Sequence, residues 1–217
     1  RWVFDELDDF SRTHIFVDGD AEIEPGSVVA MDQALHTLSG INAVAGMPVN
    51  GRSVEQYRDL LHREHGLFGD LYALSGDFLM RMKSRQLRLP EDLVGDDGLL
   101  ASMAKTNLEN EGFWSNDRVF VSERAGFRCA PMRILDIASW TNQYNRMISY
   151  SKRNFQNRVV KDIMYSTGPL GLPRQLALRY ERYGDQFEKR SGITGFFDRL
   201  AIGKMMKEYE AKPSDRT

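Results

Sequence analysis

The chain is poor in cysteine and has no long apolar run, and each absence excludes a class of protein. Among 217 residues there is one cysteine, Cys129. No disulfide can therefore form within the chain, and no zinc site can be built from several of its thiolates. The uncharged apolar runs fall far short of the ~18 residues that cross a bilayer. We expect no membrane span, and a reducing intracellular compartment or an organelle matrix in preference to secretion.

Sequence motifs of known chemistry are missing as well. There is no Gly-rich phosphate loop and no nucleophile elbow, and the four histidines are scattered. His62 and His65 are three positions apart, whereas a zinc-protease helix places its two histidines four apart. From these absences we expect no metal, no cofactor and no catalytic residue.

The acidic run that begins at Asp18 is the nearest approach to a metal motif. DGDAEIE resembles the start of a calcium loop. However, Ile23 stands at the sixth position and Val29 at the twelfth, where an EF-hand loop requires Gly and Glu. We interpret this run as an acidic turn exposed to water.

What the chain does have is enough apolar surface for a core, and an uneven charge. Hydrophobic residues make up 41% of the chain and aromatic residues 11%, which suits a globular protein. Residues 1–110 carry 19 acidic and 10 basic side chains, whereas residues 111–217 carry 12 acidic and 19 basic ones. We expect one mostly helical domain over 1–217, with a sub-boundary near 90–98 between an acidic N-terminal half and a basic C-terminal half.

The segment 131–166 dominates the predicted fold. After Pro131 it has no Pro or Gly before Gly168, and apolar residues recur at helical spacing: Ile134, Ile137, Tyr144, Ile148 and Phe155. About 35 residues at ~1.5 Å each make a rod of roughly 50 Å. We predict one unbroken helix in which Ile137, Tyr144 and Ile148 are buried.

The whole pattern predicts a mainly α fold, a multi-helix domain around this long helix at about 131–166. Two short β-hairpins are expected at about 15–24, around Asp18-Gly19, and at about 118–129, around Arg124-Ala125-Gly126. Further helices are predicted at 1–13, 27–45, 54–65, 67–85, 98–111, 174–190 and 195–210.

One polar face of the long helix is the candidate binding site. Its members follow each other at steps of four and three residues, which places them on one side of a helix: Asn142, Arg146, Ser149, Arg153 and Gln156. Residues 131–165 contain six basic and two acidic side chains. Such a face suits carboxylates, phosphates or a polyanion, or is a solvated face beside the acidic half of the same chain.

These features favour a non-catalytic structural or interaction subunit of a larger multiprotein assembly. Its partners would be other protein subunits, which bind the acidic N-terminal face and the basic C-terminal face. The first alternative is a single-stranded nucleic-acid-binding or coat-type protein, because arginines and aromatic rings alternate over 118–158. The second alternative is an enzyme, because carboxylates that are distant in sequence can assemble without a motif.

Overall fold

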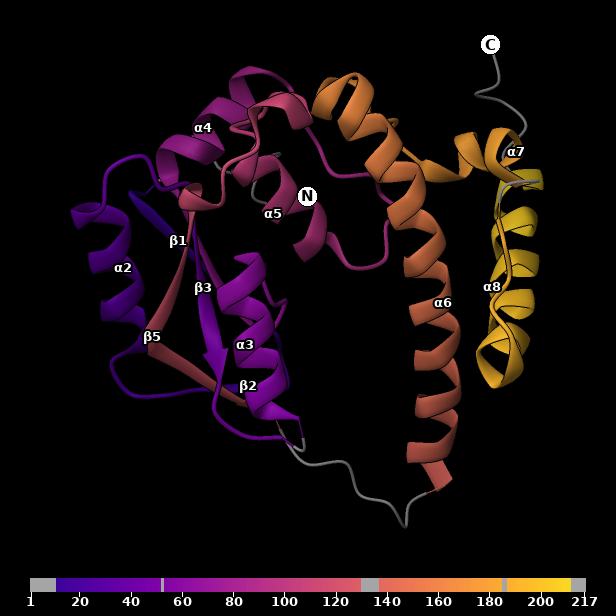
Figure 1. The fold of residues 1–217 in the computed structure, drawn as a ribbon, viewed down its shortest axis with the longest axis horizontal. Helices are drawn as coiled ribbons and strands as arrows, with labels where there is room; N and C mark the ends of the chain where they lie inside the picture. Colours follow the sequence, from indigo (N-terminus) through magenta and orange to yellow (C-terminus); the bar gives the residue numbers. More distant parts are fainter. Residues whose placement is uncertain (1–10, 52, 130–136, 185–186, 212–217) are drawn as a thin grey trace. The chain divides into compact units, whose positions relative to one another are not determined.

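The protein has a mixed α/β fold, 56% helical and 16% strand. Its structure, a computed structural model, describes residues 11–51, 53–129, 137–184 and 187–211 (Figure 1). The prediction of a mainly α domain with two hairpins was therefore wrong. Most of the helix predicted at 1–13 lies outside the described residues.

The centre of the fold is a five-stranded sheet in the order β1-β4-β3-β5-β2. Only β3 and β5 are parallel, and the other neighbours are antiparallel. The strands are β1 Thr13–Val17, β2 Ala21–Ile23, β3 Ala43–Pro48, β4 Leu71–Ser75 and β5 Val119–Cys129. A sheet of mixed direction needs crossover connections, which the intervening helices provide.

The sheet curls into a nearly closed barrel, and the chain length explains why. β1 and β2 are the two edge strands, yet β1 ends at Val17 and β2 begins at Ala21. Four residue steps reach at most about 14 Å, whereas five strands laid flat are about 19 Å across. The two edges must therefore bend toward each other, and the turn that joins them, Asp18–Asp20, closes the gap.

Neither predicted hairpin forms. The residues expected to pair around Asp18-Gly19 lie in β1 and β2, but β1 pairs with β4 and β2 pairs with β5. Residues 118–129 form the single strand β5, whose register against β3 shifts between Ala45 and Met47. The break in alternation near Arg124 is therefore an irregularity within one strand, because an extra segment of chain bulges out and pairing then resumes.

Helices surround the sheet. They are α2 Ser27–Thr37, α3 Val54–Glu64, α4 Gly76–Ser84 and α5 Asp96–Lys105, with the 3-10 turns η1 Glu111–Phe113 and η2 Asn116–Arg118. The core under α2 joins Met31 and Leu35 to Val44, Leu71 and Phe127 of three strands, and all five are at most 9% exposed. Burial of these apolar side chains stabilises the sheet against the helix.

Two predicted helices contain a buried strand. The helix expected at 27–45 ends at Thr37, Gly40 takes a left-handed conformation, and β3 follows. In the segment predicted at 67–85, β4 comes first, and the Ser75 hydroxyl then accepts the N–H of Phe78 as the cap of α4. β3 is buried at every position. A short strand that is buried on both faces is uniformly apolar, so its periodicity does not distinguish it from a helix.

The chain divides into two compact units. Unit 1 comprises Arg1–Arg88, Gly95–Pro131 and Tyr165–Leu170, and it holds the sheet. Unit 2 comprises Leu89–Val94, Met132–Met164 and Gly171–Thr217. The remaining elements are α6 Ile137–Ser166, η3 Gly168–Gly171, η4 Leu176–Arg179, α7 Tyr180–Tyr183 and α8 Gly192–Glu210.

The described part of the long helix is unbroken, as predicted, because α6 runs over 30 residues. In unit 2 it lies alongside α8 (Figure 1), where Lys152 Nζ is 2.8 Å from the Glu208 carboxylate. Ile148 is 5% exposed, which confirms its predicted burial. Tyr144 is 44% exposed, so its predicted burial was wrong, and its ring makes an edge-to-face contact with that of Phe197. The side chain of Ile137 lies outside the described residues. No helix in the described part of the chain is long and apolar enough to cross a membrane.

Candidate metal centre

A cluster of carboxylates lies at one edge of the sheet in unit 1. Asp18 and Asp20 belong to the turn that joins β1 to β2, and Asp70 immediately precedes β4. One carboxylate oxygen from each of the three lies within 4.8 Å of the others. Asp18 and Asp20 are exposed and Asp70 is half-buried, so a ligand can reach the group from solvent.

The register of two strands brings these residues together. β1 and β4 are antiparallel with Val17 opposite Leu71, so the next residue of β1 and the preceding residue of β4 are neighbours. The Asp18 N–H donates to the Asp70 carbonyl at 3.2 Å, which extends the ladder by one bond. The Ala21 N–H donates to the Asp18 carbonyl at 3.1 Å and closes the turn that carries Asp20. These two backbone hydrogen bonds therefore hold the turn that carries Asp18 and Asp20 beside Asp70.

Two further carboxylates begin α5, directly after Gly95. A Cβ atom at Gly69 would lie 3.7 Å from Asp18 Oδ2 and 3.9 Å from Asp97 Oδ2. Asp18 and Asp97, the latter 7% exposed, therefore both lie beside the backbone of Gly69. Asp96, beside it, is exposed. The site accordingly has two parts, a solvent-facing trio and an acid pair at the first turn of a helix.

The surrounding charges give this edge a strongly negative potential. Burial raises the pKa of Asp18, and the carboxylates of Asp70, Asp20, Asp96 and Asp97 raise it further. Burial and then the charges of Asp96, Asp97 and Asp18 raise the pKa of the Tyr72 hydroxyl. Carboxylates this close repel one another when they are ionised. A bound cation would offset that repulsion.

The lone thiol of the chain adjoins the same cluster. Cys129 Sγ lies 3.4 Å from Asp70 Oδ1 and donates to it. Burial, followed by the Asp70 charge and this hydrogen bond, raises the pKa of Cys129 to about 11. The thiol is therefore protonated at neutral pH and serves as a weak donor to Asp70 instead of a metal ligand.

The donor set fits a hard divalent cation. Carboxylate oxygens are the protein ligands that Mg²⁺, Mn²⁺ and Ca²⁺ prefer. Oxygens on opposite sides of an octahedral ion are about 4.2 Å apart for Mg²⁺ and about 4.8 Å apart for Ca²⁺. The observed spread of up to 4.8 Å between ligand atoms therefore accommodates either ion with small side-chain movements. Three ligands leave coordination positions open for water or for oxygens of a substrate.

The predicted binding face of α6 has a different arrangement. Arg146 and Ser149 are exposed, Arg153 is partly buried, and Gln156 is fully buried. The side chain of Asn142 lies outside the described residues. The role of this face in binding stays a prediction.

Gln156 makes an internal network within unit 2. Its Oε1 accepts the Val94 N–H at 2.8 Å, and its Nε2 donates to the Asp92 carbonyl at 2.8 Å and to the Tyr180 hydroxyl at 2.7 Å. The Asp92 carboxylate in turn accepts the N–H groups of Leu176 and Ala177. Gln156 therefore anchors the segment that precedes Gly95 and is not presented to solvent.

The carboxylate cluster was missed from sequence because its members come from two separate segments, the turn at 18–20 and the residue before β4. The available signal was an Asp-Gly-Asp run directly after the apolar strand Ile15–Val17, with a second acid pair at Asp96-Asp97. An EF-hand loop draws its ligands from one continuous segment, whereas Asp70 is distant in sequence from Asp18 and Asp20. The His62 side chain lies 2.5 Å from Glu123 Oε1, and the other carboxylate oxygen of Glu123, Oε2, accepts a hydrogen bond from Arg58.

Comparisons with known proteins supply no family for this chain. No protein-family model matches it, and a search of curated proteins finds no significant match. The inference of function therefore depends on the geometry of the site.

Proposed function

We propose that the chain is a divalent-cation-dependent glycosyltransferase, which moves a sugar from a nucleoside diphosphate donor to a hydroxyl group of an acceptor. The single observation that carries this proposal is the convergence of Asp18, Asp20 and Asp70, with ligand atoms within 4.8 Å of one another, beside the acid pair of α5. In many enzymes, a divalent cation that is held by carboxylates and has open coordination positions binds the phosphates of the substrate.

The diphosphate part follows from the open coordination positions. Asp18, Asp20 and Asp70 would hold the cation, which would supply positive charge to offset the negative charge of the leaving diphosphate. The ends of strands at a sheet edge, next to the first turn of a helix, are a common place for such ligands. Asp18 and Asp70 are tied by a backbone hydrogen bond of 3.2 Å, so they would hold the ion without a large rearrangement.

The sugar part follows from the sign of the surrounding charge. Phosphoryl transfer needs cationic side chains or a Gly-rich loop around the group that moves, whereas the groups that perturb Asp18 are all carboxylates. Negative charge suits a transition state with positive charge on the anomeric carbon, as in the hydrolysis of glycosides. The reaction class that fits both the cation trio and the acid pair is therefore transfer of a glycosyl group.

Asp97 is the residue we assign as general base. Its Oδ2 lies near Gly69, as does Oδ2 of Asp18, and it is not one of the three ligands. In the proposed step the acceptor oxygen bonds to the anomeric carbon, the bond from that carbon to the diphosphate breaks, and the acceptor proton passes to Asp97. One displacement of this kind inverts the configuration at the anomeric carbon.

The test combines cation binding with turnover of the full chain. Mn²⁺ binding is measured by electron paramagnetic resonance, and release of nucleoside diphosphate is measured over a panel of nucleoside diphosphate sugars with and without Mn²⁺ or Mg²⁺. We expect Asp18→Asn and Asp70→Asn to weaken Mn²⁺ binding, whereas Asp97→Asn keeps Mn²⁺ binding and lowers turnover by about 10²-fold or more. Asp59→Asn, which removes an exposed acid of α3, is the matched control.

Two outcomes would reject the proposal. One is Mn²⁺ binding that the ligand variants leave unchanged, and the other is an absence of cation-dependent turnover with every donor of the panel. The expectation of a non-catalytic assembly subunit, with protein partners on the acidic and basic faces, would then be favoured and tested by isolating the native complex. The nucleic-acid-binding alternative also stays a prediction, with salt-dependent affinity as its test.

A further inference from the structure

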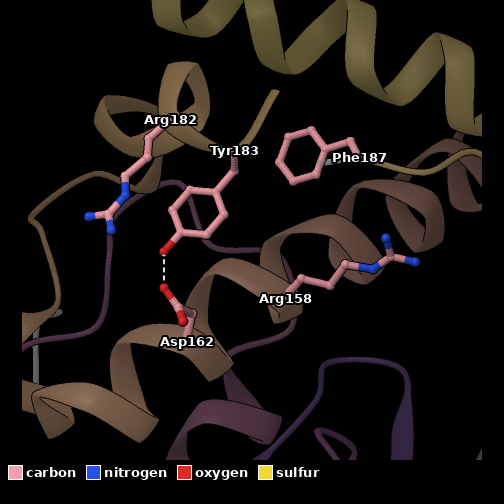
Figure 2. Close-up of a pocket in the computed structure, with 5 residues that line it drawn as sticks. All are labelled: Arg158, Asp162, Arg182, Tyr183 and Phe187. Carbon is pink, nitrogen blue, oxygen red and sulfur yellow. Dashed lines mark hydrogen bonds between the residues drawn. The ribbon is translucent and has the colours of Figure 1, made fainter. Parts of the chain in front are cut away.

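Unit 2 contains a cavity whose lining differs chemically from the carboxylate cluster of unit 1. It has a volume of about 300 Å³ and is lined by Arg158, Asp162, Arg182, Tyr183 and Phe187. Arg158 and Asp162 come from α6, Arg182 and Tyr183 from α7, and Phe187 follows α7 (Figure 2). All five residues belong to unit 2. The volume is that of a small-molecule site.

Two aromatic rings form its apolar wall. Tyr183 and Phe187 are 8% and 6% exposed, so both rings are packed in place. The Phe187 ring centroid is 4.9 Å from that of Phe155 on α6, and the Tyr183 hydroxyl donates to Asp162 Oδ2. Figure 2 shows the hydroxyl of Tyr183 directed at the carboxylate and the two rings side by side. The wall is therefore rigid, and one acidic oxygen of the cavity is already occupied.

Arginines form the rim. Arg158 and Arg182 are exposed. The guanidinium carbon of Arg158 lies 5.7 Å from the centroid of the Phe155 ring, and that of Arg182 lies 5.9 Å from the centroid of the Tyr183 ring, which are distances typical of cation–π contacts. Within the described part of unit 2, neither guanidinium forms an ion pair. Figure 2 shows their side chains on opposite sides of Tyr183. Both side chains are exposed, so their guanidinium groups are able to turn onto a ligand.

A third arginine adds to the same field. Burial, and then the hydrogen bond to Asp162, raise the pKa of Tyr183, while the charges of Arg182 and Arg179 act against them. Arg179 therefore lies close enough to influence the cavity. Among the described lining residues, Asp162 is the one acid beside two arginines, so this lining has an excess of positive charge, which attracts anions.

We propose that this cavity binds a phosphate monoester, with the phosphate on the arginines of the rim and the organic group against Tyr183 and Phe187. Guanidinium forks match the oxygens of phosphate in pairs, and several arginines favour a dianion over a carboxylate. The two rings supply apolar contact for the rest of the ligand. This site is independent of the proposed transferase activity.

The test uses phenyl phosphate as the probe, because it carries both chemical features. Its binding to the full chain is measured by titration calorimetry and compared with that of inorganic phosphate. We expect saturable binding that is tighter for phenyl phosphate. Arg158→Gln combined with Arg182→Gln should weaken it by about tenfold or more, because charge-assisted hydrogen bonds to phosphate are lost. Phe187→Leu should remove the preference for phenyl phosphate over inorganic phosphate.

The control variant removes two positive charges elsewhere in unit 2. Lys204→Gln combined with Lys207→Gln changes two exposed lysines of α8 and should leave binding unchanged. Vesicles of phosphatidic acid in phosphatidylcholine distinguish a lipid headgroup from a soluble ester. If the chain binds these vesicles through its arginines but does not bind phenyl phosphate, the phosphate monoester is a lipid headgroup. Equal weakening in the lysine control, or no arginine-dependent binding to either probe, would overturn the inference.

Discussion

Replacement of Asp20 by Asn should change the stability of the protein in opposite directions with and without a cation. Asp20 offers one of three carboxylate oxygens that lie within 4.8 Å of one another. Two negative charges at that separation repel each other by about 1 kcal/mol in the high dielectric constant that applies to exposed groups. Asp20 takes part in two such pairs, and salt reduces both.

In cation-free buffer we therefore expect Asp20→Asn to stabilise unit 1 by about 1 kcal/mol, which raises its midpoint of thermal unfolding by a few degrees. With Mn²⁺ the order reverses. A cation at a hundred times its dissociation constant stabilises the wild-type protein by about 2.7 kcal/mol, whereas the variant, with one ligand fewer, gains little.

The assay is differential scanning fluorimetry or calorimetry in chelator and in a series of Mn²⁺ concentrations. Asp59→Asn, an exposed acid on α3, is the control and should follow the wild-type protein in both buffers. A variant that is less stable than the wild-type protein in chelator would refute the repulsion argument. Equal Mn²⁺-induced shifts in the variant and the wild-type protein would refute the ligand assignment.

Three further predictions concern other parts of the chain. Gln156→Leu should lower the free energy of unfolding of unit 2 by about 3 kcal/mol. The Gln156 side chain makes three hydrogen bonds at 0% exposure, and the variant would leave their partners unpaired. A loss below about 1 kcal/mol in chemical denaturation would contradict this prediction. The hydrogen bonds from Arg190 lower the pKa of Asp198 to about 2. Asp198 should therefore contribute about 1–2 kcal/mol to the free energy of unfolding, after allowance for the solvent around Arg190. This contribution is present above pH ~4 and is lost as the pH falls toward 2. The Asp198→Asn variant should therefore be less stable than the wild-type protein at pH 7. Its stability should also change less between pH 4 and pH 2, as measured by acid titrations followed by circular dichroism. Gly69→Leu should fill the space between Asp18 and Asp97 and lower turnover with little change in the circular dichroism spectrum, whereas Gly69→Ala, with ordinary contacts of 3.7 and 3.9 Å, should keep most activity.

Helices with one polar side were predictable from the sequence because their period is local. The segment at α3 and the one at α8 were placed within a few residues, and the long helix was recognised from its spacing and from the absence of Pro and Gly. Strands β3 and β4 were not, because buried strands lack alternation. Strand β5 was mistaken for a hairpin, since a bulge and a turn both interrupt the period of two.

The sequence by itself determined the single thiol, the absence of a long apolar run, the uneven charge and the unbroken periodicity of α6. Only the tertiary structure decided which acids meet. Asp18 and Asp20 become neighbours of Asp70 because β1 pairs with β4 in a particular register, and Asp97 joins them because α5 begins across Gly69. Contacts between residues about 50 or more positions apart depend on the pairing of strands and the packing of helices, and no local pattern records them.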